Sequence, residues 1–155
     1  MEEYITRSTA ETEELGSALA ESIIHGQKKH GCVIALYGGL GMGKTAFVRG
    51  LASGLGLDAE VSSPTFALVH EYGGQPPLVH FDMYRVSGWD DLTTTGYFDY
   101  LDGGALLAVE WSERIENALP PDAVRVRFER LSDDGRRILI ENAPALHPAQ
   151  KGGYL

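Results

Sequence analysis

Cysteine is nearly absent from this sequence: Cys32 is the single one among 155 residues. A disulfide within the chain is therefore excluded, and Cys32, which lies in an apolar run, is expected to be a small buried residue. Long apolar runs are also missing, since none approaches the roughly 20 residues of a membrane-spanning helix. The start, Met1-Glu2-Glu3, is acidic and unlike a secretory signal. Together these features predict a cytoplasmic protein that does not associate with membranes.

Basic residues are scarce as well. The chain has 13 Lys and Arg against 22 Asp and Glu, which gives a formal net charge of −9. Broad electrostatic binding of nucleic acid needs clustered Lys and Arg against the phosphates. Any role in nucleic-acid chemistry is therefore expected to require a basic partner. No Lys or Arg occurs between residues 86 and 110, which argues against an arginine-rich lid in that segment.

Glycine, in contrast, is abundant, with 19 residues. Positions 38–45 read Gly-Gly-Leu-Gly-Met-Gly-Lys-Thr and match the phosphate-binding P-loop pattern. The apolar run 32–37 precedes the motif as a buried strand would, and apolar residues at helical spacing follow it. In such a loop, backbone N–H groups converge on phosphate oxygens, Lys44 reaches the β- and γ-phosphates, and the Thr45 hydroxyl binds Mg²⁺. The motif predicts a protein that binds a nucleoside triphosphate.

The rest of the pattern predicts one domain over residues 1–142. The uniformly apolar segment 105–109 is typical of a strand buried on both faces. Alternating segments predict two hairpins, one within 66–82 and one within 124–140. We therefore expect an α/β, P-loop NTPase-like fold, in which a parallel core sheet is extended by antiparallel hairpins and has helices on both faces.

Three less regular regions complete this picture. Ser8 to Glu11 resembles a capping box, so a helix is expected to begin there. Residues 88–104 are acidic and irregular and predict one short helix, and another short helix is expected between Trp111 and Pro120. The segment 143–155 contains prolines and glycines, and we expect it to be a flexible C-terminal tail.

Two carboxylates follow apolar strands, where the sites of α/β proteins collect. Glu110 would lie near the P-loop if its strand neighbours 32–37, and Asp82 has the form of a Walker B acid. A provisional assignment gives Glu110 to Mg²⁺ and Asp82 to the metal shell or the attacking water; the sequence does not rank the two. Thr65, after Ser62-Ser63-Pro64, is either a γ-phosphate sensor or part of an ordinary proline turn.

Other side chains leave alternatives open. Trp111 either covers the nucleotide site, anchors a partner, or packs under the following helix. His70 and His80 lie on opposite strands of one hairpin without zinc-ligand spacing, and are expected to be structural. Arg136 and Arg137 follow a tight turn and could reach phosphate or a partner, although surface solubility is the default interpretation.

Four segments taken together resemble the bacterial TsaE (YjeE) family in order and spacing. They are Gly-Leu-Gly-Met-Gly-Lys-Thr-Ala-Phe-Val-Arg-Gly (39–50), Ser-Pro-Thr-Phe-Ala-Leu-Val-His-Glu-Tyr (63–72), His-Phe-Asp-Met-Tyr-Arg-Val (80–86) and Val-Glu-Trp-Ser-Glu (109–113). Leu15-Gly16 and Gly135-Arg136 match as well, and the similarity covers roughly residues 8 to 141. The P-loop is widespread, whereas Ser-Pro-Thr-Phe, Phe-Asp-Met-Tyr-Arg and Glu-Trp in combination are specific.

The resemblance implies a small P-loop ATPase needed to form threonylcarbamoyladenosine at the tRNA adenosine beside the anticodon, acting with TsaD and TsaB proteins. It also implies residue roles, which are as follows: Leu40, Gly41, Met42, Gly43, Lys44 and Thr45 hold ATP, Thr45 and Glu110 bind Mg²⁺, Asp82 assists hydrolysis, Trp111 lies at the nucleotide site, Arg136 lies near ATP, and Thr9–Thr12 lies near the base. The sequence departs from the family at Gly39, where Asp or Glu is usual, and at 91–96, which is less acidic than usual.

These observations favour a slow ATPase that uses its cycle to reset a tRNA-modifying complex and meets tRNA only indirectly. One rival is a small-molecule kinase, with Asp82 as base toward a hydroxyl acceptor. Another is a nucleotide-dependent binding module without turnover.

Overall fold

A computed structural model of the chain describes residues 1–26, 32–39, 41–57, 61, 69–144 and 146. The strands that it contains are β1 (Glu2–Thr6), β2 (Cys32–Tyr37), β3 (Val69–Gly74), β4 (Pro77–Asp82), β5 (Leu106–Glu110), β6 (Val124–Arg130) and β7 (Arg136–Glu141). The helices are α1 (Thr9–His25), α2 (Lys44–Gly54), α3 (Trp89–Thr94), α4 (Tyr97–Asp102) and the 3₁₀ helix η1 (Ser112–Ala118).

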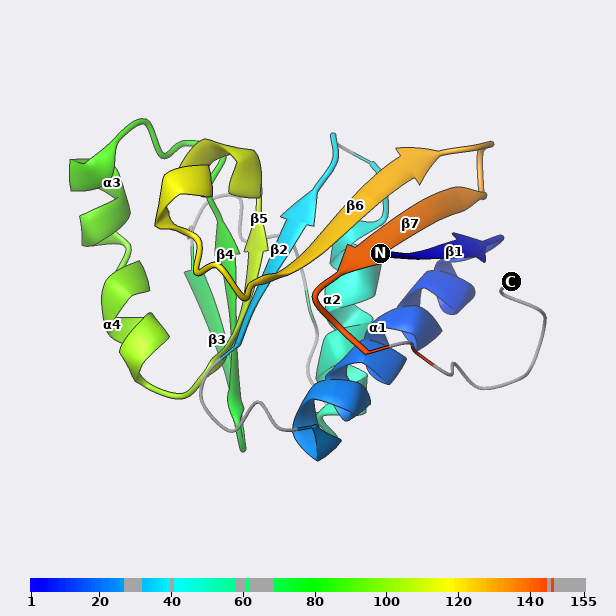
Figure 1. Cartoon of the computed structure of the whole chain (residues 1–155), viewed down its shortest axis with the longest axis horizontal. Coiled ribbons are helices and arrows are strands. Elements are labelled where there is room, and N and C mark those ends of the chain that lie inside the picture. Colours follow the sequence, from blue (N-terminus) through cyan, green and yellow to red (C-terminus); the bar gives the residue numbers. More distant parts are fainter. Residues whose placement is uncertain (27–31, 40, 58–60, 62–68, 145, 147–155) are drawn as a thin grey trace.

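Within the described residues, the strands form one sheet in the order β1-β7-β6-β2-β5-β4-β3 (Figure 1). The four central strands, β6, β2, β5 and β4, are mutually parallel, and β1, β7 and β3 add antiparallel pairs at the two sides. The predicted parallel core with antiparallel extensions is therefore confirmed. The first hairpin is present over β3 and β4, while residues 66–68 of its predicted first strand lie outside the described residues. Its second strand, β4, also pairs in parallel with β5 and so belongs to the core.

Helices cover both faces of the sheet, as expected (Figure 1). On one face, α1 and α2 pack on alternate residues of β2, β6 and β7 to form the larger core. On the other, α3, α4 and η1 enclose a second core with the opposite residues of β2, β4 and β5. In β2 the even-numbered positions belong to the first core and the odd-numbered positions to the second, so this strand is buried on both sides.

The start of α1 follows the predicted capping pattern. The Ser8 hydroxyl accepts a hydrogen bond from the Glu11 N–H at 3.1 Å, and the Glu11 carboxylate accepts one from the N–H of Arg7 at 2.9 Å. The strand β1 just before it was not predicted, because its inward side is only Tyr4 and Thr6. Pairing with β7 holds β1 in place, which a local pattern cannot show.

The acidic segment 88–104 contains two short helices, α3 and α4, where one was predicted. Each spans 6 residues, too short for a helical period to stand out, and both are stabilised by aromatic packing. Tyr97 is fully buried and meets Phe81 edge to face, with ring centroids 5.8 Å apart.

Part of the predicted C-terminal tail lies against the domain. Leu146 is buried, and its N–H donates to the Tyr4 hydroxyl at 2.9 Å. Residues 145 and 147–155 lie outside the described part of the chain.

Glycine allows α1 and α2 to cross at very short distance. A Cβ atom added at Gly50 of α2 would lie 1.9 Å from the Glu13 carbonyl oxygen of α1, and one added at Gly16 of α1 would lie 2.2 Å from the Phe47 oxygen of α2. Backbone cannot yield locally at such distances, so the helices would have to separate. Their contact fixes the P-loop helix against the rest of the domain.

We expect Gly50→Ala to lower the free energy of unfolding by about 3 kcal/mol, because overpacking displaces both helices. Thermal or urea unfolding measures the change. Gly103→Ala is the control, because its Cβ would meet neighbours only at 3.6 Å and its φ of −89° suits alanine. Equal losses in the two variants would contradict the close crossing.

Candidate functional site

The P-loop connects β2 to α2 in the order that the motif requires. The chain leaves β2 at Tyr37, and α2 begins at Lys44. Gly41 and Gly43 have φ values of 73° and 100°, in the left-handed region that glycine adopts without strain. This backbone, together with the helix start, suits the convergence of N–H groups on an anion. Leu40, also predicted to hold ATP, lies outside the described residues.

Lys44 is nearly buried, with 5% of its surface exposed. Its Nζ donates to the Gly38 carbonyl oxygen at 2.6 Å and lies 4.5 Å from the centroid of the Trp111 ring. Burial lowers the pKa of the Lys44 ammonium, while the nearby carboxylates of Glu110, Glu113 and Asp82 oppose this effect. A partly desolvated cation therefore lies at the P-loop beside a group of acids.

The two predicted carboxylates lie side by side. Asp82 ends β4, Glu110 ends β5, and the two residues are register partners in parallel strands, which are about 4.8 Å apart. Both are 5% exposed. Asp82 is an even number of residues from Leu78 on β4, and Glu110 is two residues from Ala108 on β5, so each acid lies on the same face of the sheet as that residue. Leu78 and Ala108 belong to the core formed with α1 and α2, and hence both acids lie on the P-loop side of the sheet. Glu110 was expected near the P-loop if its strand neighbours β2, and the structure meets this condition.

His80 is a site residue that sequence reasoning placed among structural residues. It is fully buried, and its Nε2 lies 2.5 Å from Glu110 Oε2. Asp82, two residues later, accepts a hydrogen bond from the Tyr84 N–H at 2.9 Å. The spacing of His80 and Asp82 was a usable signal, since residues i and i+2 of a strand share a face.

Trp111 has left-handed backbone, with φ 59° and ψ 43°. Such a conformation in a residue other than glycine costs of order 1–3 kcal/mol. The turn brings the half-buried indole against Lys44, and the ring of Tyr84 packs on it with centroids 4.9 Å apart. Trp111 thus lies beside the P-loop lysine and also packs against the second core, and its role at the nucleotide site stays a prediction.

Arg136 contacts the P-loop backbone. Its Nε donates to the Met42 carbonyl oxygen and one terminal nitrogen donates to that of Gly41, both at 3.1 Å. The other terminal nitrogen donates to carbonyl oxygens in the β6–β7 turn, at Ser132, Asp133 and Gly135. The guanidinium thus connects the β6–β7 turn to the P-loop and binds carbonyl oxygens of the loop. This structural role of Arg136 was not visible in the sequence.

We expect Arg136→Ala to weaken binding of an ATP analogue about 10- to 100-fold, because the loop carbonyls lose a charged donor that is worth about 1.5–3 kcal/mol per bond. Titration calorimetry with Mg²⁺ measures the effect. Arg137→Ala is the matched control, because the ion pairs that Arg137 makes among the described residues, with Glu3 and Glu129, are exposed. Similar affinities for the two variants would show that the Arg136 contacts do not shape the loop.

The three predicted threonines differ in what the structure shows. Thr45 is the second residue of α2 and is half-buried. Thr9 is exposed at the start of α1, which approaches the P-loop: a Cβ added at Gly43 would lie 3.7 Å from the Thr12 methyl carbon. Thr65 lies outside the described residues.

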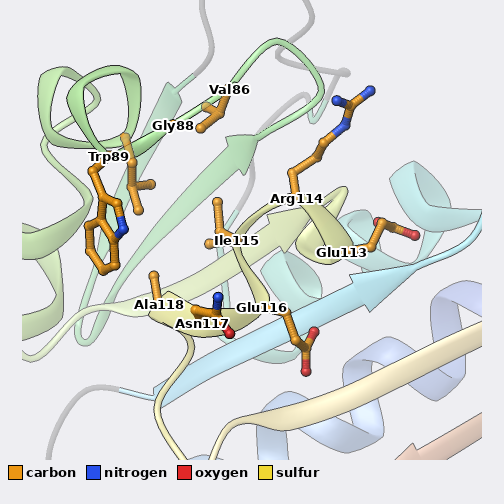
Figure 2. A pocket seen from close by; sticks show the side chains of 10 residues that line it. Val86, Gly88, Trp89, Glu113, Arg114, Ile115, Glu116, Asn117 and Ala118 are labelled. Atoms are coloured by element: carbon orange, nitrogen blue, oxygen red, sulfur yellow. The ribbon is translucent and has the colours of Figure 1, made fainter.

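A pocket of about 180 Å³ lies between α3 and η1 (Figure 2). Its lining includes Val86, Trp89, Leu92 and Ile115, and three of these belong to the second core, on the face of the sheet opposite α2. Figure 2 shows the Arg114 side chain directed away from Trp89. None of the predicted site residues lines this pocket, so it gives no support to an acceptor site next to Asp82.

Within the described part of the chain, no group of three or more His, Cys, Asp or Glu side chains could hold a metal by itself. Mg²⁺ commonly binds one or two carboxylates together with substrate phosphates. The Thr45 hydroxyl and Glu110 beside a P-loop fit that type of site. Among the described residues, no helix is long and apolar enough to cross a membrane.

Comparisons with known proteins agree with this geometry. The family model described as "Threonylcarbamoyl adenosine biosynthesis protein TsaE" matches residues 6–138. A tRNA threonylcarbamoyladenosine biosynthesis protein TsaE from Treponema pallidum is 35% identical over 136 residues, covering 88% of this chain and 97% of the relative. One from Bacillus subtilis is 41% identical over 111 residues, covering 71% of this chain and 69% of the relative.

A solved structure agrees as well. The crystal structure of YdiB from Bacillus subtilis superposes with a TM-score of 0.70 at 34% identity, covering 88% of this chain and 82% of that one. Because the matched range contains the P-loop, both acids and Trp111, the chain belongs to the TsaE family, which acts in tRNA threonylcarbamoyladenosine biosynthesis.

Proposed function

We propose that this protein is the P-loop ATPase subunit of threonylcarbamoyladenosine formation in tRNA. It binds ATP with Mg²⁺ and hydrolyses it to drive or reset a complex of TsaD-like and TsaB-like proteins in the cytoplasm. The observation that carries the proposal is the grouping of the P-loop lysine, Lys44, with two nearly buried carboxylates, Asp82 and Glu110, at the ends of adjacent parallel strands.

The P-loop binds the triphosphate in this proposal. Amides of Gly41 to Thr45 would hold its oxygens, and the Lys44 ammonium would exchange the Gly38 carbonyl for β- and γ-phosphate oxygens. Because Lys44 is already desolvated, it gives up little hydration when it meets the nucleotide. Arg136 would keep the loop carbonyls away from the phosphates, rather than contact ATP itself.

Thr45 and Glu110 would hold Mg²⁺, and the bound ion would neutralise charge that develops on the phosphates. Asp82, next to Glu110 but not bonded to His80, would orient the attacking water or complete the metal shell. Trp111 would cover the site from the side of Lys44. Thr65 is proposed as a γ-phosphate sensor, and Thr9 as a residue near the base.

Charge supports an indirect relation to tRNA. The net charge of −9 gives no general attraction to phosphate backbones, so a partner would supply the contacts with tRNA. Hydrolysis in this protein would then act on the partner complex and not on the tRNA itself.

Reconstitution tests the proposal. Purified protein with TsaD-like and TsaB-like partners, tRNA and threonylcarbamoyl-adenylate is assayed for phosphate release and for modified adenosine by mass spectrometry. We expect slow hydrolysis by the protein alone, faster hydrolysis with partners, and modification that depends on ATP over many turnovers. Absence of phosphate release with all components would favour a binding module, and phosphate found on a metabolite would favour a kinase.

A further inference from the structure

The buried histidine of β4 has no role in the function proposed above. His80 is fully buried, and its Nε2 meets Glu110 Oε2 at 2.5 Å. Because a carboxylate only accepts, Nε2–H is the donor. Within the described part of the chain, His80 Nδ1 is the one buried side-chain nitrogen or oxygen without a hydrogen-bond partner. Buried polar groups are normally paired, so a histidine that forms a single bond to a site carboxylate calls for an explanation.

We propose that His80 is a positioning residue: its Nε2–H holds Glu110 by Oε2 and so leaves Oε1 as the carboxylate oxygen available to Mg²⁺. The inference rests on the proposed function, because it concerns the same site. His80 itself would touch neither nucleotide nor metal.

The sheet gives the contact its rigidity. Asp82 is the register partner of Glu110, so His80 lies two residues behind that pair on the neighbouring parallel strand and on the same face. Both strands are interior strands, each paired on both sides. A hydrogen bond between two such strands fixes the long Glu110 side chain before the metal binds. Without this bond, the entropy cost of ordering the side chain would fall on metal binding itself.

Lys44 gives a physical reason for this restraint. Its ammonium lies at the same site, and among the carboxylates that act on it Glu110 has the largest effect. Without the hydrogen bond to His80, the Glu110 carboxylate would be drawn to Lys44. Glu110 would then be less available to Mg²⁺, and Lys44 less available to the phosphates. The bond to His80 holds the carboxylate on the β4 side.

Two amide variants separate positioning from packing. In His80→Gln the amide nitrogen can reach the place of Nε2, and in His80→Asn it falls short. Dissociation constants of a non-hydrolysable ATP analogue are measured by calorimetry on the full chain, in Mg²⁺ and in EDTA. We expect similar metal-free affinity in all proteins. In Mg²⁺, we expect His80→Asn to bind about 10- to 100-fold more weakly than the wild type, and His80→Gln to stay within a few-fold of it.

His70→Asn is the matched control. His70 is the register partner of His80 on β3 and bonds Tyr72 instead of Glu110, so its loss should leave both affinities unchanged. Two results for His80→Asn would overturn the inference while the proposed function stands. One is an equal loss of affinity for the ATP analogue in Mg²⁺ and in EDTA. The other is an affinity in Mg²⁺ that equals that of the wild type. If the wild type itself gains nothing from Mg²⁺, the proposed function falls and this inference with it. Should His80→Asn fail to fold, His80→Gln decides: a retained Mg²⁺ effect supports positioning, and a lost one overturns it.

Discussion

Replacing Lys44 by alanine is expected to lower kcat/KM for ATP by about 10²- to 10³-fold, the usual cost of removing one preorganised donor. The reason is electrostatic as well as local. Without the ammonium, Asp82 and Glu110 stay nearly buried and unneutralised, and they repel the incoming triphosphate. Phosphate release and the yield of threonylcarbamoyladenosine in the reconstituted system measure the effect, and both should fall together.

Two controls separate charge from packing. Lys44→Met keeps an aliphatic side chain against Trp111 but not the charge, so it should be as inactive as the alanine variant. Arg49→Met removes a cation from the same helix, where Arg49 pairs with Glu13 at 2.7 Å, and should leave turnover unchanged. Normal modification by Lys44→Ala would show that the P-loop is not used for catalysis.

Asp82→Asn is expected to lower turnover by about 10²- to 10⁴-fold, the range for loss of a general base, while ATP binding stays within a few-fold of the wild type. The asparagine oxygen can still accept from the Tyr84 N–H, so the backbone after β4 keeps its hydrogen bond. Single-turnover phosphate release, combined with calorimetry in Mg²⁺, separates the two effects.

An exposed acid provides the comparison. Asp99→Asn in α4 changes charge equally and should not change turnover. If Asp82→Asn instead removes the Mg²⁺ dependence of binding and Glu110→Gln does not, the metal belongs to Asp82 and the two assignments are reversed.

Local patterns predicted the central part of the fold well. The apolar runs of β2 and β5 have no alternation, as strands buried on both faces should, and the structure places them side by side. The glycine motif required strand, loop and helix in that order, which the structure contains. The position of Glu110 near the P-loop was predicted on the condition that these two strands are neighbours, and the structure meets that condition.

Contacts between distant segments were not predictable in the same way. Arg136 reaches Gly41 across 95 positions, and β1 depends on pairing with β7. The left-handed turn at Trp111 gives no sequence signal, because tryptophan has no preference for it. The role of His80 was missed because a histidine in a strand is usually a packed residue, and only the register of β4 with β5 shows its partner.

The guanidinium that joins the last hairpin to the phosphate-binding loop also orders events during synthesis. A ribosome releases residues 38–45 long before it releases Arg136, and β6 must first dock on β2 to bring that side chain into reach. Nascent chains that end before this hairpin therefore carry the whole motif without its clamp. If the loop binds a nucleotide as proposed, its full affinity would be reached only after the C-terminal part of the domain has joined the sheet.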